Sequence, residues 1–175
     1  VQRWSYNMLG LPTETLPLAL RTVRFNAELE PDLALSFVYF PYPGTELGRQ
    51  CVEAGYLGDR EVDHYRAGAT LRLPRFPRHD ILFVQRFFPY LVRLYSLSRR
   101  GPAPMRRAWP AVLDALLTSP LLPRRVLVGL HERYHALRHR VGEQVVRRSP
   151  ALYRRLGGRD QGVLPRPTPA RPEAA

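Results

Sequence analysis

Two short apolar runs, each followed by a turn rich in glycine and proline, constrain the fold more than any other feature of this sequence. The first run covers residues 5–9 and the second covers residues 33–40. Between them, apolar residues recur at helical spacing, at Leu16, Leu20, Val23 and Ala27. Alternation of apolar strands with amphipathic helices is typical of a parallel sheet with crossover helices. The second run is nearly unbroken, which predicts a strand covered on both faces.

Helical patterns follow the second run. Thr45 is placed to cap a helix with an inner face of Leu47, Cys51 and Ala54. Further helices are expected over residues 78–96, with a kink at Pro89, and over 111–117. The longest should cover 123–146 and bury a stripe made of Leu127, Leu130, Tyr134, Leu137, Val141 and Val145.

The pattern therefore divides the chain into three regions. Residues 1–75 are expected to be an α/β segment, and residues 76–158 an all-helical extension. Residues 159–175 carry four prolines among polar residues, which predicts a disordered tail. Because the chain starts at Val1 without a methionine, and residues 4–11 already read as the end of a buried strand, we expect a further N-terminal portion to precede it.

The net charge of +12 comes entirely from arginine, since the sequence contains no lysine. A GC-rich coding sequence favours arginine codons over lysine codons, so this arginine content can arise without selection for binding to a nucleic acid or another polyanion. The arginine pairs are spread over the helical region with few aromatic residues between them, which favours solvated helix faces. A basic surface that binds a polyanion remains the alternative. No run is long enough to span a membrane and no signal peptide is recognisable, so a cytoplasmic location is expected.

Cys51 is the only cysteine. One thiol cannot form an internal disulfide or hold a metal site that needs several cysteines. Its spacing with Leu47 and Ala54 indicates a small core residue rather than a reactive thiol.

Two motifs carry a resemblance to a known family. Residues 7–15, Asn-Met-Leu-Gly-Leu-Pro-Thr-Glu-Thr, resemble the turn after the fifth strand of radical S-adenosylmethionine (SAM) enzymes. Residues 40–47, Phe-Pro-Tyr-Pro-Gly-Thr-Glu-Leu, resemble the end of the sixth strand, at the spacing found in that family. Residues 54–57 and 75–78 are similar to members that carry a cobalamin-binding domain ahead of the barrel. The resemblance implies the C-terminal portion of a partial (β/α)6 TIM-like barrel, followed by the helical extension.

The resemblance also implies a site. In the family, the first turn packs on the adenine of SAM, and the backbone beyond the sixth strand helps to bind the same base. Ligands of parallel α/β sheets bind at the carboxyl ends of strands, where both motifs lie. The adenine-binding residues implied are Met8, Gly10, Leu11, Pro12, Phe40, Pro41 and Tyr42, with Glu14 one position later than in the strictest form of the motif. We expect Gly10 to let a flat ring approach the backbone.

The same resemblance implies two cofactors, SAM and a [4Fe-4S] cluster, whose full set of binding residues this chain does not contain. The three-cysteine loop for the [4Fe-4S] cluster follows the first strand of the family's barrel, and the motif for the methionine amino group follows the second. Neither is present, so this chain alone should be inactive. The parent is expected to cleave SAM reductively to a 5′-deoxyadenosyl radical, or to use SAM and cobalamin to methylate an unactivated carbon. It needs the N-terminal half of the barrel as a partner, and the substrate stays open.

A rival metal site is present in the sequence. His131-Glu132-Arg133-Tyr134-His135 matches the H-E-x-x-H pattern of zinc peptidases, in which two histidines hold zinc and the glutamate polarises a water. Both histidines rotate away from the apolar stripe of their helix, and the nearby arginines oppose a cation. A solvated helix face is therefore the favoured interpretation, with a zinc metallopeptidase as the alternative.

Overall fold

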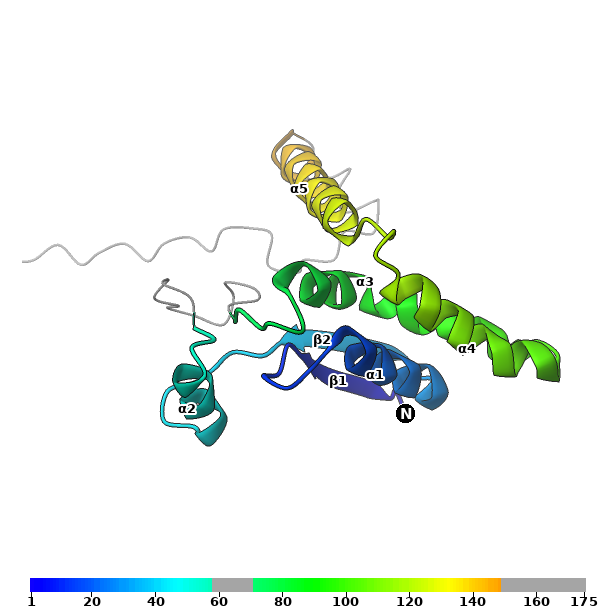
Figure 1. The fold of residues 1–175 in the computed structure, drawn as a ribbon. Helices are drawn as coiled ribbons and strands as arrows, with labels where there is room; N and C mark the ends of the chain where they lie inside the picture. The colour runs from blue at the N-terminus through cyan, green and yellow to red at the C-terminus, as the bar shows by residue number, and fades with distance from the viewer. Residues whose placement is uncertain (58–70, 149–175) are drawn as a thin grey trace, which may run out of the picture. The chain divides into compact units, whose positions relative to one another are not determined.

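The computed structural model describes the backbone of residues 1–57 and 71–148, and side chains within 1–57, 71–99 and 101–141. The chain divides into one compact unit of residues 1–129 and a second that begins at Leu130. In chain order, the described elements are β1 (Trp4–Leu9), α1 (Leu16–Leu29), β2 (Leu33–Val38), α2 (Glu46–Glu53), α3 (Arg78–Ser96), the short 3-10 helix η2 (Leu97–Arg100), α4 (Ala103–Thr118) and α5 (Arg124–Arg148) (Figure 1).

The two strands lie side by side and run parallel, with Trp4 opposite Leu33 and Leu9 opposite Val38. Helix α1 connects them, and Thr15 stands at its N-cap with Pro17 in its first turn. The mixed α/β character predicted from the sequence is confirmed, with parallel strands alternating with helices. No closed barrel is formed by the described residues.

One face of the sheet is covered by α1 and α3. The Asn26 side chain, fully buried on α1, donates to the Asn7 side chain at 2.7 Å and accepts from the Ser5 hydroxyl at 2.6 Å. On β2, the Ser36 hydroxyl donates to the Gln85 carbonyl of α3 at 3.2 Å. Because Asn7 and Ser36 are opposite each other in the ladder, their side chains share a face, so both helices pack on the same side.

The opposite face of the sheet is exposed, which corrects the prediction that β2 is covered on both sides. Exposed fractions are 55% for Trp4, 64% for Tyr6 and 51% for Phe37. The rings of Tyr6 and Phe37 stack with their centroids 6.1 Å apart. The paired rows that form this open face are Trp4, Tyr6 and Met8 on β1 and Leu33, Leu35 and Phe37 on β2.

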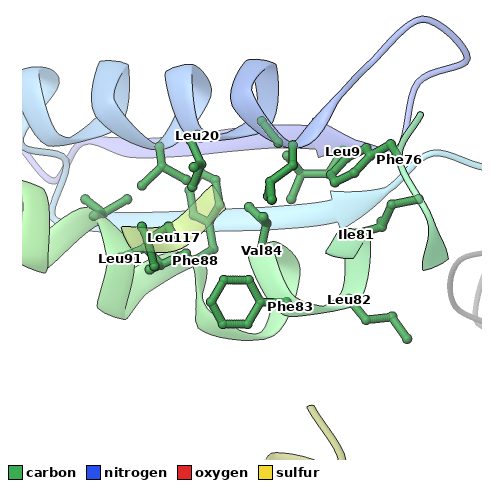
Figure 2. Packing of buried hydrophobic residues seen from close by; sticks show 14 of the residues in the cluster. Leu9, Leu20, Phe76, Ile81, Leu82, Phe83, Val84, Phe88, Leu91 and Leu117 are labelled. Carbon is green, nitrogen blue, oxygen red and sulfur yellow. The ribbon is translucent and has the colours of Figure 1, made fainter. Parts of the chain in front are cut away.

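The hydrophobic core lies between the covered face of the sheet and helices α1, α3 and α4 (Figure 2). The predicted stripe of α1 is confirmed, and α3 has the predicted bounds with Pro89 inside it. Asp114 of α4 joins three helices, because its carboxylate accepts from Arg24 of α1 at 2.9 Å and from the Tyr95 hydroxyl of α3 at 2.6 Å. The kink at Pro89 stays a prediction.

Three predicted details are wrong. Helix α4 begins at Ala103, eight residues before the predicted start at 111, because Pro104 lies in its first turn, where no backbone donor is needed. Ala54 is exposed beyond the end of α2. On α5 the predicted stripe is buried only at its start, where Leu127 packs partly against the core, while Leu130, Tyr134, Leu137 and Val141 are 50% to 61% exposed.

The predicted disordered tail, residues 159–175, lies outside the described residues. So do residues 58–70 of the α/β segment and residues 149–158, the last part of the predicted helical extension. The helices that are described include none with the length and apolar content needed to cross a membrane.

Candidate functional site

The turn after β1 is closed by Glu14. Gly10 has a φ of +80°, a left-handed conformation that favours glycine. The Glu14 carboxylate accepts from the backbone N–H of Gly10 and, at 3.3 Å, from that of Leu11. The Glu14 N–H donates back to the Leu11 carbonyl at 2.9 Å. The position of Glu14 in the motif therefore has a structural role, in which one carboxylate satisfies two backbone donors of a buried turn.

Glu14 is itself buried, with 8% of its surface exposed. Burial raises the pKa of the Glu14 carboxyl above its usual value, while the hydrogen bonds from Gly10 and Leu11 act in the opposite direction.

Gly10 serves packing as well as turn geometry. A Cβ at this position would lie 3.3 Å from Cδ1 of Ile81 on α3 and 3.6 Å from Cγ1 of Val38 on β2. Gly10 is buried, so the space left by its missing side chain is filled by the protein itself. The surfaces that this turn offers to a ligand are the half-buried Leu11 and Pro12 rather than the glycine.

The turn after β2 leaves the sheet at the same edge. The Tyr39 N–H donates to the Leu9 carbonyl at 2.7 Å, so the ladder continues to the last residue of β1. Phe40 and Tyr42 contact edge to face with ring centroids 4.9 Å apart, on either side of the buried Pro41. Tyr42 is 54% exposed, which leaves its ring available to a ligand.

A pocket of about 460 Å3 lies beside the second turn. Pro41 and Tyr42 form part of its wall, which the rest of the loop before α2, residues of α2 and Leu57 complete. The residues of the first turn do not line it. The structure thus brings the two turns to one edge of the sheet, while the pocket belongs to the β2 side.

Gly48 is a residue that sequence reasoning missed. A Cβ there would overlap the Tyr42 carbonyl oxygen and lie 2.8 Å from Oγ1 of Thr45. Thr45 caps α2 as predicted, accepting from the Gly48 N–H at 3.0 Å. The glycine allows the first turn of α2 to fold against the loop. The signal available in the sequence was a glycine three residues after a capping threonine.

Cys51 is fully buried, as the apolar spacing predicted. Burial raises the pKa of its thiol, and the nearby Tyr39 hydroxyl acts in the opposite direction. A buried thiol with a raised pKa is a poor nucleophile and a poor metal ligand.

The H-E-x-x-H residues lie on α5. The rings of His131 and His135 are in contact, with centroids 4.3 Å apart, and Tyr134 meets His135 edge to face. Within the residues described, no group of three or more His, Cys, Asp or Glu side chains is placed to hold a metal ion. The zinc alternative gains no third ligand from this part of the chain.

No protein-family model, curated protein or solved structure matches this chain. The resemblance to radical SAM enzymes therefore rests on the two turn motifs and on their spacing.

Proposed function

We propose that residues 1–75 are the last two βα units of a radical SAM barrel and that their two turns bind the adenine side of SAM. The observation that carries the proposal is the hydrogen bond from the Tyr39 N–H to the Leu9 carbonyl, at the ends of adjacent parallel strands. It puts the turns at Gly10 and Pro41 at one edge of the sheet, where α/β folds bind ligands.

The open face of the sheet supports the same proposal. In a (β/α) barrel, helices cover the outer face of the sheet and the side chains of the inner face point into the barrel. Here α1 and α3 cover one face, and the other exposes Tyr6, Met8 and Phe37. We assign the open face to the barrel interior, where these side chains would line the substrate channel.

The second turn offers the polar groups that a purine requires. At the first turn, the N–H groups of Gly10 and Leu11 are already bonded to Glu14. Within the described residues, no hydrogen bond uses the backbone N–H of Phe40 or Tyr42. Adenine would pack on Leu11 and Pro12, stack against the exposed Tyr42 ring and take its hydrogen bonds from the backbone after β2.

The iron-sulfur cluster does not fit the residues present. The one cysteine, Cys51, is buried, so its thiolate is not available to a cluster of several cysteine ligands. In the family, that cluster supplies the electron that cleaves SAM, and its ligands would come from sequence ahead of Val1. The narrower proposal of a cobalamin-dependent methyl transfer rests only on residues 54–57 and 75–78.

Adenosine titration of the 15N-labelled chain tests the adenine site. We expect the largest amide shift changes within residues 8–11 and 40–42, and no comparable change with uridine. Loss of the Tyr42 ring in Tyr42→Ala should weaken adenosine binding about fivefold, the effect of losing about 1 kcal/mol of base stacking. Tyr90→Ala removes an equally exposed ring from α3 and should leave binding unchanged. Equal responses to adenosine and uridine would count against the site.

The coding sequence provides a second test. Ahead of Val1, the reading frame is expected to encode three cysteines separated by three and by two residues. The complete protein should then release 5′-deoxyadenosine from SAM under reducing conditions. A frame without those cysteines would remove the family assignment.

A further inference from the structure

Helix α5 presents an exposed apolar stripe whose members are Leu130, Tyr134, Leu137 and Val141. Their exposed fractions are 56%, 60%, 61% and 50%. At 100° per residue the four positions fall within an arc of about 60° of the helix. Large apolar side chains aligned on one exposed face indicate a surface that is covered by another molecule.

Arginines border this stripe on both sides. On a helical wheel, Arg133 and Arg140 flank one edge and Arg138 the other, while Glu132, His135 and His139 lie on the far side. Between residues 130 and 148 the sequence has five arginines and two glutamates, a net charge of +3. A helix with an apolar face bordered by cations is suited to lie in the interface of an anionic bilayer, with its arginine stems along the apolar boundary.

A second copy of the helix fits this surface poorly. Leu130, Tyr134, Leu137 and Val141 occupy the seam positions of a heptad pattern, so pairing with another α5 is the obvious rival. The positions that flank such a seam are His131, Arg133, Arg138 and Arg140. In a dimer the arginines among these flanking residues would face one another across the interface as like charges, in either orientation. The same charges are complementary to acidic lipid headgroups.

We propose that α5 binds anionic membrane surfaces through this stripe and its bordering arginines. RNA offers the same negative charge, but its bases stack on aromatic rings rather than cover leucine and valine, so the stripe favours lipid. The proposal is independent of the SAM site, because it rests only on residues after Gly129.

Vesicle flotation of the full chain tests the proposal. Vesicles with about one third phosphatidylserine should carry the chain upward, whereas pure phosphatidylcholine should not. Leu130→Gln/Leu137→Gln keeps the charge and removes the apolar contact, so binding should fall at least tenfold. Its matched control, His135→Gln/Ala136→Gln, places the same glutamines away from the stripe and should bind like the unaltered chain. Circular dichroism verifies that each variant keeps its helix content.

The charge contribution has its own variant. Arg133→Gln/Arg140→Gln should weaken binding roughly 25-fold, since each interfacial arginine contributes about a factor of five. Failure of the unaltered chain to float with acidic vesicles overturns the proposal. So does a stripe variant that floats normally but sediments as a smaller species than the unaltered chain, because α5 would then pair with itself. Tighter binding to polyuridylate than to acidic vesicles, unaffected by the leucine substitutions, would overturn it in favour of RNA.

Discussion

The Glu14 carboxylate accepts the backbone N–H of Gly10, four residues earlier, and so closes the turn at the carboxyl end of β1. This contact is made inside the protein, since both residues are buried. A buried carboxylate is costly when charged, and here it is retained because two backbone donors would otherwise lose their partner.

Glu14 should therefore give stability a measurable pH dependence. Its folded-state pKa is raised above the ordinary value of 4.5, so its contribution is fully present below that value and is lost as pH rises through the folded pKa. Glu14→Gln cannot ionise. The free energy of unfolding of the unaltered chain, relative to Glu14→Gln, should fall between pH 4 and pH 8 in urea titrations. A pH-independent difference would contradict the assignment. Glu14→Ala, which leaves both donors unpaired, should cost about 1–3 kcal/mol at pH 4, and this cost should shrink toward pH 8 because alanine cannot ionise either.

Gly48 and Gly129 should respond to alanine in opposite directions. At Gly48 the new methyl group would overlap the Tyr42 carbonyl, so we expect Gly48→Ala to lower the free energy of unfolding by about 1–3 kcal/mol. Gly129 lies within α5 with open space around its Cα, so Gly129→Ala should be neutral or raise helix stability by up to about 1 kcal/mol. Thermal and urea unfolding of the two variants give the comparison. Equal effects would mean that the loop moves aside for the methyl group.

The ion pair between Asp80 and Arg124 is expected to be the most sensitive contact between side chains. Arg124 Nε lies 2.6 Å from the Asp80 carboxylate, the two side chains are 12% and 9% exposed, and the guanidinium also donates to the carbonyls of Leu117 and Ser119. Arg124→Met removes the charged partner of a buried carboxylate and leaves only His79, whose Nε2 lies 3.3 Å from the Asp80 carboxylate, so it should cost about 3–5 kcal/mol. Arg125→Met removes an exposed arginine from the next position and should change stability by less than about 0.5 kcal/mol. Similar losses in both variants would contradict the burial argument.

The hydroxyl of Tyr95 should contribute more than that of Tyr90. Tyr95 is buried and donates to the Asp114 carboxylate at 2.6 Å, whereas Tyr90 is 59% exposed. Tyr95→Phe should therefore lower the free energy of unfolding by about 2 kcal/mol, as expected for a hydrogen bond to a charged group. Tyr90→Phe serves as the control and should be neutral. A Tyr95→Phe chain as stable as the control would mean that Asp114 finds another donor.

Local patterns predicted most elements because they report which residues share a face. The bounds of α3, the cap at Thr45 and the burial of Cys51 all follow from spacing and capping chemistry over a few residues. The same patterns did not reveal that Phe37 and Leu137 are exposed. An apolar stripe indicates that a surface is to be covered, but not whether its cover lies within the described residues.

Local sequence patterns could not predict contacts between residues that lie far apart in the sequence. Asp80 and Arg124 are 44 positions apart, and nothing near either residue distinguishes it from a solvated charge. The packing of Ile81 against Gly10 is similar, because the spacing of the first turn shows only that a glycine follows a strand. For the candidate site, the sequence therefore placed both turns at one edge but did not show which atoms remain open to a ligand.

Ile81 fills the space beside Gly10, so the residues at these two positions should change together as sequences diverge. In homologues, a larger residue at position 10 should coincide with a shortened one at position 81, and a bulkier residue at 81 should keep glycine at 10. Recurrence of that correlated exchange among diverged sequences would identify the start of α3 as part of the same inherited unit as the turn.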